Sequence, residues 1–169
     1  MKKLISSDTN VWFDFQCISK TPLPFMLPYT YLIYYETLRE EIIDPPELIN
    51  ELTSLGIEAT EITIEEFLHA EKFGSKYKAL SKYDKIALAI AKERCIPLLT
   101  GDFALRKAAR AEGVEVLGTI GILDQLYDGK YIKKSEYKEC LENLRDAQSR
   151  RLPVEEINSR LQSLAKDGD

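Results

Sequence analysis

Acidic residues follow two segments that resemble β-strands, at the point where each segment ends. Asp8 directly follows Lys3–Ser7, and Asp102 follows Ile96–Thr100 with only Gly101 between them. Turn residues bound both segments, and this predicts two strands of a parallel sheet. Ligands of open α/β sheets bind at the carboxyl edge where the strand order reverses, so the two carboxylates should converge there if the strands are neighbours.

Two further carboxylates can reach the same edge. Asp84 begins the alanine- and isoleucine-rich segment that leads into the second strand, so one helix and one strand return the chain to that edge. Glu41 follows the predicted strand Tyr31–Tyr35 and is expected in the first turns of a helix, with Glu36 and Glu40 as competitors for its role. Crowded carboxylates raise one another's pKa unless a cation balances them, and oxygen ligands select hard ions. The cluster predicts Mg²⁺ or Mn²⁺.

Each of these acids also has a simpler interpretation. Asp8 and Asp84 could be helix N-caps, and Asp102 could be a turn residue, each contributing about 1 kcal/mol locally. Their joint placement at one edge of one sheet favours the metal site, because independent caps need not all fall there.

The elements that must position these acids alternate between strands and helices, which predicts an α/β fold with a parallel central sheet. Further strands are expected at Ile57–Ile62 and Val114–Leu117, and helices at Lys85–Arg94, Phe103–Glu112 and Thr119–Tyr127. The helix at Lys85–Arg94 is apolar almost all round, so it should be the most buried. Gly113 is expected to take a left-handed conformation at the end of a helix.

The C-terminal part of the chain has the pattern of two more helices. Ser135 could N-cap a helix that extends to about Ser149, and Pro153 fits the first turn of the last helix. The apolar stripe of that last helix consists of Val154, Ile157, Leu161 and Leu164. It is either a lid on the core or an interface for a second subunit, and the lid is favoured because helices must cover each face of a parallel sheet.

The composition is that of an ordinary globular domain. The chain has 169 residues, 44% hydrophobic and 30% charged, which predicts one domain with a real core. There is no apolar stretch near the ~20 residues of a membrane-spanning helix and no apolar core of a secretion signal, so we expect a cytoplasmic protein. Cys17, Cys95 and Cys140 have neither disulfide-framework nor zinc spacing and are expected to be buried free thiols.

The charges are unevenly distributed along the chain. A net charge of −5, from 23 basic and 28 acidic residues, excludes a protein that coats nucleic acid by bulk electrostatics. Eleven acids and a single base, Arg39, lie between Glu36 and Glu71, whereas five lysines lie between Lys72 and Lys85. Both runs are either solvated helix faces, or an acidic face for a basic protein partner and a basic rim beside the acidic site.

Five segments resemble the successive motifs of a known family. In order along the chain they are LISSDTNVW, TLREEI, LSKYDKIALAIA, LLTGDFALRKAA and GVEVLGTIGILDQL. Together they cover Lys3 to Ile132 and resemble the PIN domain family of metal-dependent ribonucleases. The resemblance implies a three-layer α/β/α sandwich, with residues 1–132 as the nuclease domain and residues 133–169 as a helical extension packed on the same domain.

The resemblance also implies an activity and its residues. PIN domains of this kind hydrolyse RNA phosphodiester bonds with Mg²⁺ or Mn²⁺, and many are toxins of toxin–antitoxin pairs, although the extension here resembles that of a different PIN-like subgroup. The acidic positions of the family fall on Asp8, Glu41, Asp84 and Asp102, of which the three aspartates would hold one or two metal ions. Asn10 and Thr100 match polar supporting positions. The implied partners are an RNA substrate and a small antitoxin-like protein; a second copy of the chain is the partner that the apolar stripe of the last helix would take as an interface.

Other side chains have weaker claims to function. Lys82, Lys85 and Arg106 are candidates to contact substrate phosphates, or are solvated charges. Tyrosines of the strand region could stack on unpaired bases, but at strand spacing beside prolines they more often pack in the core; they are Tyr29, Tyr31, Tyr34 and Tyr35. His69 is the only histidine and is expected to be a surface residue.

Rival function classes fit less well. Phosphatases of the haloacid dehalogenase type need a second acid at the position of Asn10, and a dinucleotide-binding fold needs a glycine fingerprint after the first strand that this chain lacks. The serious alternative is a catalytically inactive PIN-like module for nucleic-acid binding or assembly.

Overall fold

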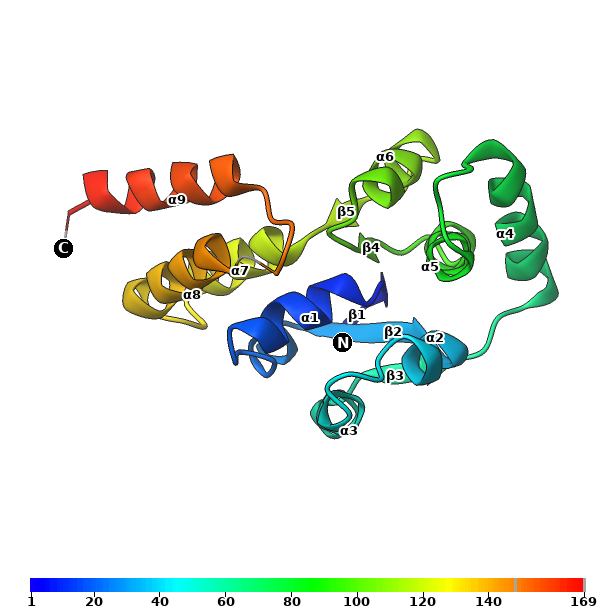
Figure 1. The fold of residues 1–169 in the computed structure, drawn as a ribbon, viewed down its shortest axis with the longest axis horizontal. Coiled ribbons are helices and arrows are strands. Elements are labelled where there is room, and N and C mark those ends of the chain that lie inside the picture. Colours follow the sequence, from blue (N-terminus) through cyan, green and yellow to red (C-terminus); the bar gives the residue numbers. More distant parts are fainter. Residues whose placement is uncertain (148, 169) are drawn as a thin grey trace.

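A five-stranded, all-parallel sheet lies at the centre of the computed structural model, which describes residues 1–147 and 149–168 (Figure 1). Its strands are β1 (Lys3–Ser7), β2 (Tyr29–Tyr34), β3 (Glu58–Thr60), β4 (Leu98–Leu99) and β5 (Val116–Leu117). Their spatial order is β3-β2-β1-β4-β5, so the direction of strand addition reverses at β1. Ser7 pairs with Leu99, and the Asp8 N–H donates to the Leu99 carbonyl at 2.9 Å. This confirms that the strands before Asp8 and Asp102 are neighbours at the switch point.

The strand bounds differ from the predicted ones except at β1. β2 begins at Tyr29 rather than Tyr31, and β3, β4 and β5 are shorter than their apolar runs. β3 is short because it lies at the edge of the sheet and pairs only with β2. β4 begins only at Leu98 because the preceding residue, Pro97, has no N–H to donate to a neighbouring strand.

Helices cover both faces of the sheet, which confirms the three-layer α/β/α architecture (Figure 1). The core cluster of one face is built mainly from α1 (Asn10–Cys17), the 3₁₀ helix η1 (Leu23–Met26), α2 (Tyr35–Glu40), α3 (Glu47–Leu55), α7 (Thr119–Asp128), α8 (Lys134–Asp146) and α9 (Val154–Lys166). The cluster of the other face is built from α4 (Ile64–Lys76), α5 (Lys82–Glu93) and α6 (Phe103–Ala111). Leu98 joins one cluster and Leu99 the other, because successive strand side chains point to opposite faces.

Helix α5 confirms the prediction of a buried helix in this part of the chain. Every residue from Ile86 to Ala91 of α5 is buried, so this helix is enclosed as expected. The left-handed conformation of Gly113 is also confirmed, with φ +74° after α6.

Other details of the sequence-based prediction were wrong. Ser135 does not cap α8, which begins at Lys134 and ends at Asp146 rather than Ser149. Cys140 is buried, but Cys17 and Cys95 are exposed, because both lie at the ends of helices rather than inside the core. None of the helices in the described residues is long and apolar enough to cross a membrane.

The last helix packs along α8 (Figure 1). Ile157 and Leu164 of its stripe are buried in the same cluster as the sheet residues Ile5 and Tyr31, and Leu161 packs against it. Val154, at the start of the stripe, stays 46% exposed. Three of the stripe residues therefore contact the core of the sandwich.

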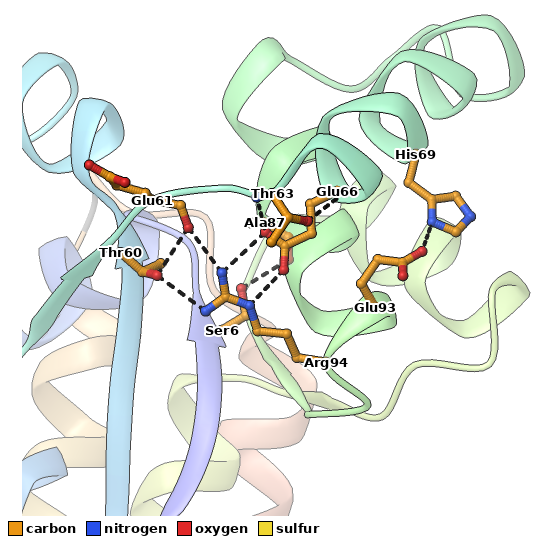
Figure 2. A network of polar contacts seen from close by, with 9 residues as sticks. All are labelled: Ser6, Thr60, Glu61, Thr63, Glu66, His69, Ala87, Glu93 and Arg94. Carbon is orange, nitrogen blue, oxygen red and sulfur yellow. Dashed lines mark hydrogen bonds and ion pairs between the residues drawn. The ribbon is translucent and has the colours of Figure 1, made fainter.

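A partly buried ion pair fixes α4 against the end of α5 and the edge strand (Figure 2). The Arg94 guanidinium donates to Glu66 Oε1 at 2.6 Å and Oε2 at 3.1 Å, and also to the Thr60 hydroxyl at 3.1 Å. The Glu66 side chain is only 3% exposed and also caps α4 through the Thr63 N–H. Burial alone would raise the pKa of Glu66, but the hydrogen bonds from Arg94 and Thr63 hold that pKa below its ordinary value.

This pair lies one turn from a second contact between the same helices. His69 of α4 pairs with Glu93 of α5, so the only histidine serves a contact at the surface (Figure 2). On the sheet side, the Ser6 hydroxyl donates to the Ala87 carbonyl at 2.9 Å and holds α5 against β1. The helix that carries Asp84 is therefore fixed on both sides.

We expect Arg94→Met to lower the free energy of unfolding by about 3–5 kcal/mol, because it leaves the buried Glu66 carboxylate without its partner. Urea denaturation at neutral pH measures the loss. Because the pKa of Glu66 is lowered on folding, its contribution is complete above 4.5 and fades as the pH falls further, so the two proteins should converge in acid. Arg110→Met, at an exposed position of α6, is the matched control and should change stability by less than ~0.5 kcal/mol. Equal stability of Arg94→Met and the parent chain at neutral pH would contradict this interpretation.

Candidate functional site

Asp8 lies at the carboxyl end of β1 and is 6% exposed. Its Oδ1 accepts from the Thr9 N–H at 2.8 Å, and its Oδ2 accepts from the Thr100 hydroxyl at 2.9 Å. Burial and the Asp84 charge raise the pKa of Asp8 to about 7, although the hydrogen bonds from Thr9 and Thr100 act in the opposite direction. The fold therefore holds this carboxyl where ionisation is costly.

Thr100 joins Asp8 to the loop that carries Asp102. Its hydroxyl oxygen accepts from the Asp102 N–H at 3.1 Å while its hydrogen goes to Asp8. The Asp102 Oδ1 accepts from the Leu105 N–H at 2.8 Å and caps α6. Asn10 Oδ1 accepts from the Gly101 N–H at 3.1 Å and fixes the same loop. Both predicted supporting residues thus contact the β4–α6 turn.

Asp84 enters the same edge from the first turn of α5. Its Oδ2 accepts from the Ser81 N–H at 2.9 Å, and its own N–H donates to the Ser81 hydroxyl at 3.2 Å, which is a capping box. Burial raises the pKa of Asp84, and the negative charge of Asp102 raises it further. The cap uses Oδ2 in these hydrogen bonds and leaves Oδ1 out of them.

Glu41 follows α2 as its C-cap residue and does not lie in the first turns of a helix, because α2 already begins at Tyr35 and ends at Glu40. Its Oε1 is buried and has no hydrogen-bond partner in the described part of the chain. Burial raises the pKa of Glu41, and the Asp84 charge adds to the effect. A buried carboxylate oxygen without a partner is costly and calls for a ligand.

The two competitors of Glu41 are engaged elsewhere. Glu40 accepts a hydrogen bond from the Tyr83 hydroxyl, and Glu36 accepts from Lys82 at 3.4 Å and from the Tyr35 hydroxyl at 3.3 Å. Glu41, by contrast, raises the pKa of Asp8, and the Asp84 charge raises its own pKa.

The four acids form one electrostatic group. Asp8 is affected by Asp84 and Glu41, Glu41 by Asp84, and Asp84 by Asp102, in each case with a raised pKa. Among residues 1–147 and 149–168, no three metal-binding side chains already have the spacing of a coordination shell. The donor set and the partnerless Glu41 oxygen nevertheless fit a hard divalent cation, which would relieve the repulsion that raises these pKa values.

The three basic candidates have different surroundings. Lys82 pairs with Glu36, and the Lys85 side chain lies against Gly74, 3.2 Å from where a Cβ would be. Arg106 lines a cavity of about 550 Å³ beside Asp102. Of the three, Arg106 is the one that lines this cavity next to Asp102.

The tyrosines divide between core and rim. Tyr31 is fully buried and donates to the Pro24 carbonyl at 2.7 Å, and Tyr29 donates to Gln125 at 2.8 Å. Tyr34 and Tyr35 are half-buried and in edge contact with each other. At least Tyr31 is a packing residue and not a platform for bases.

One pair at this site was missed from the sequence. Asp14 of α1 is buried and accepts from Arg150 Nε at 2.7 Å and from the Thr119 hydroxyl at 2.6 Å. Arg150 also donates to the Asn10 carbonyl at 3.0 Å. An acid within the apolar run VWFDF was a signal for a buried pair, but nothing in the sequence pointed to Arg150.

Comparison with protein families gives a direct result. A family model described as a PIN domain, DUF3368, matches residues 16–166. The chain belongs to the PIN domain family. The match contains Glu41, Asp84 and Asp102 and begins after Asp8; it also extends beyond Ile132 to the end of α9, further than the motif resemblance. Neither the curated proteins nor the solved structures contain a significant match to this PIN domain.

Membership in the family sets the class of chemistry. PIN domains are generally nucleases that act on nucleic acid and typically use divalent metals. The carboxyl edge with Asp8, Glu41, Asp84 and Asp102 is the candidate site of this PIN domain for such chemistry.

The raised pKa of Asp8 predicts how the stability of the fold depends on pH. Between 3.8, the ordinary value, and about 7, the folded protein keeps a proton that the unfolded chain has released, so stability falls as the pH rises through this interval. Asp8→Asn removes this contribution. Without divalent ions, the variant should match the parent chain near pH 4 and melt at a higher temperature at pH 8.

Thermal unfolding in EDTA across this pH range measures the effect. Asp128→Asn, at an exposed position of α7, is the control and should follow the parent chain at every pH. If the Asp8 variant is less stable than the parent chain at pH 8, the ionised Asp8 carboxylate stabilises the fold and the proposed repulsion is wrong.

Proposed function

We propose that this PIN domain is a metal-dependent endoribonuclease that hydrolyses phosphodiester bonds in RNA. The observation that carries the proposal is the convergence of Asp8, Glu41, Asp84 and Asp102 at the switch point of the sheet, with raised pKa values at Asp8, Glu41 and Asp84. Carboxylates held together in this way suit a hard cation and a phosphate substrate.

Asp8, Asp84 and Asp102 would hold Mg²⁺ or Mn²⁺. When bound, such an ion orients a water molecule, lowers its pKa and balances charge on the scissile phosphate. Thr100 keeps Asp8 and the Asp102 loop in register through its paired hydrogen bonds. Glu41, with its partnerless oxygen and raised pKa, either joins the ligands or accepts a proton from the attacking water.

A second candidate function is a binding or assembly module that does not cleave. The observation that favours it is the charge of the segment from Glu36 to Glu71, whose eleven acids and one base suit a protein partner better than RNA. Metal binding without turnover on any RNA would support this alternative. The acidic segment between Glu36 and Glu71 would suit a basic protein partner in either case, and a small antitoxin-like protein is the protein partner that the family implies.

Purified protein should cut single-stranded RNA in the presence of Mn²⁺ or Mg²⁺ and stop when EDTA is added. We expect Asp8→Asn and Asp102→Asn to lower the cleavage rate by at least about 100-fold, because each removes a carboxylate from the metal site. Glu41→Gln should have a comparable effect, whereas Glu40→Gln should leave most of the activity. Gel assays of a labelled RNA, with circular dichroism to verify folding, measure these changes.

Asp128→Asn is the control for the aspartates. Cleavage at the parental rate by both Asp8→Asn and Asp102→Asn would refute the assigned site. Loss of activity in Glu40→Gln and its retention in Glu41→Gln would move the second acid to Glu40.

A further inference from the structure

A cavity of about 550 Å³ lies between three segments that are far apart in the sequence: the start of α6, the start of α7 and the connection from α8 to α9. Asn10 and Asp102 of the candidate site line it as well. Its volume is within the usual range of small-molecule sites, ~300–1,000 Å³. An occupant would therefore adjoin the acidic edge.

Arginines from each side face this cavity. They are Arg106 of α6, Arg150 and Arg151 of the connection, and Arg160 of α9. The acids of the lining are Asp14, Asp102 and Glu156. A chain with a net charge of −5 thus concentrates guanidinium groups around one recess, and such groups bind phosphate in forked geometry.

The arginines differ in how they are held. Arg150 is fixed by Asp14 at 2.7 Å, and Arg160 by Asp124 at 3.0 Å. Within the described residues, no ion pair occupies Arg106 or Arg151. The paired arginines build the wall, and the other two have charge available for a ligand.

Gly118 makes room for the Arg106 side chain. A Cβ at this position would lie 3.3 Å from Arg106 Nη1 and 3.5 Å from the Thr100 carbonyl oxygen. The guanidinium therefore lies close to the backbone of the β5–α7 turn, on the same side as the Thr100 that joins Asp8 and Asp102.

We propose that this cavity receives a nucleotide of the substrate strand next to the scissile bond, with Arg106 and Arg151 on its phosphate. The inference rests on the proposed ribonuclease function and adds a subsite to it. It makes the connection between α8 and α9 part of the substrate site, because Arg151 comes from that connection and Arg150 ties it to α1. Since phosphate contacts carry no sequence information, the subsite would position RNA of any sequence.

The test is the equilibrium binding of a labelled single-stranded RNA to the full chain in EDTA, where no cleavage occurs. Fluorescence anisotropy measures the binding at several salt concentrations. Arg106→Gln and Arg151→Gln should each weaken binding about tenfold and lower the salt slope by about 1, the signature of one lost phosphate contact. Arg110→Gln and Arg145→Gln, outside the cavity lining, are the matched controls and should bind like the parent chain. Arg106→Lys should recover the salt slope. If the cavity variants bind like the controls, the subsite is wrong.

A nucleoside 5′-monophosphate, titrated by calorimetry, separates the subsite from the nuclease function. A protein that cleaves RNA, but whose Arg106→Gln and Arg151→Gln variants keep the parental affinity and KM, would overturn the subsite alone. A protein that cleaves no RNA but binds the monophosphate, and loses it with Arg106→Gln, would support the subsite and refute the nuclease. Absence of binding of both RNA and monophosphate to the parent chain would overturn the subsite.

Discussion

Repulsion between carboxylates at the carboxyl edge is the constraint that the surrounding structure has to withstand. Asp8 is held against it by the β1–β4 ladder and by Thr100, and Asp84 by its capping box with Ser81. Behind them, α5 is enclosed between the sheet and α4, and the Arg94–Glu66 pair fixes that contact. The packed core thus supplies the stability that lets charged groups remain close together, as is common at functional sites.

Helix capping and ligand binding are not alternatives for these acids. A cap needs one carboxylate oxygen, and the Asp84 and Asp102 caps use Oδ2 and Oδ1 respectively. The same hydrogen bonds that start α5 and α6 fix the direction of each carboxyl group. The two interpretations that the sequence left open for Asp84 are therefore compatible, and the helix starts serve as the scaffold of the site.

The alternation of strands and helices was enough to predict the fold class and to place Asp8 and Asp102 after parallel strands. Whether those strands are neighbours stayed open in the sequence, and the pairing of β1 with β4 in the structure answers it. Other features depend on contacts that no local pattern contains. One is the end of α2 at Glu40, which leaves Glu41 at a helix C-cap rather than in the first turns of a helix. The pair of Asp14 and Arg150 joins residues 136 positions apart, so neither it nor the arginine-lined cavity was visible from local periodicity. By contrast, the start of α4 is visible in the sequence, because Thr63 and Glu66 have the spacing of a capping box.

The central claim is that the acids at the switch point share a divalent cation. Crystals of the full chain grown with Mn²⁺, with diffraction recorded at the manganese absorption edge, test it most directly. The account predicts an anomalous peak in contact with the carboxylates of Asp8, Asp84 and Asp102, and the peak also shows whether Glu41 is a ligand. An ordered site with no manganese between these side chains at saturating Mn²⁺, or manganese bound only elsewhere, would contradict it.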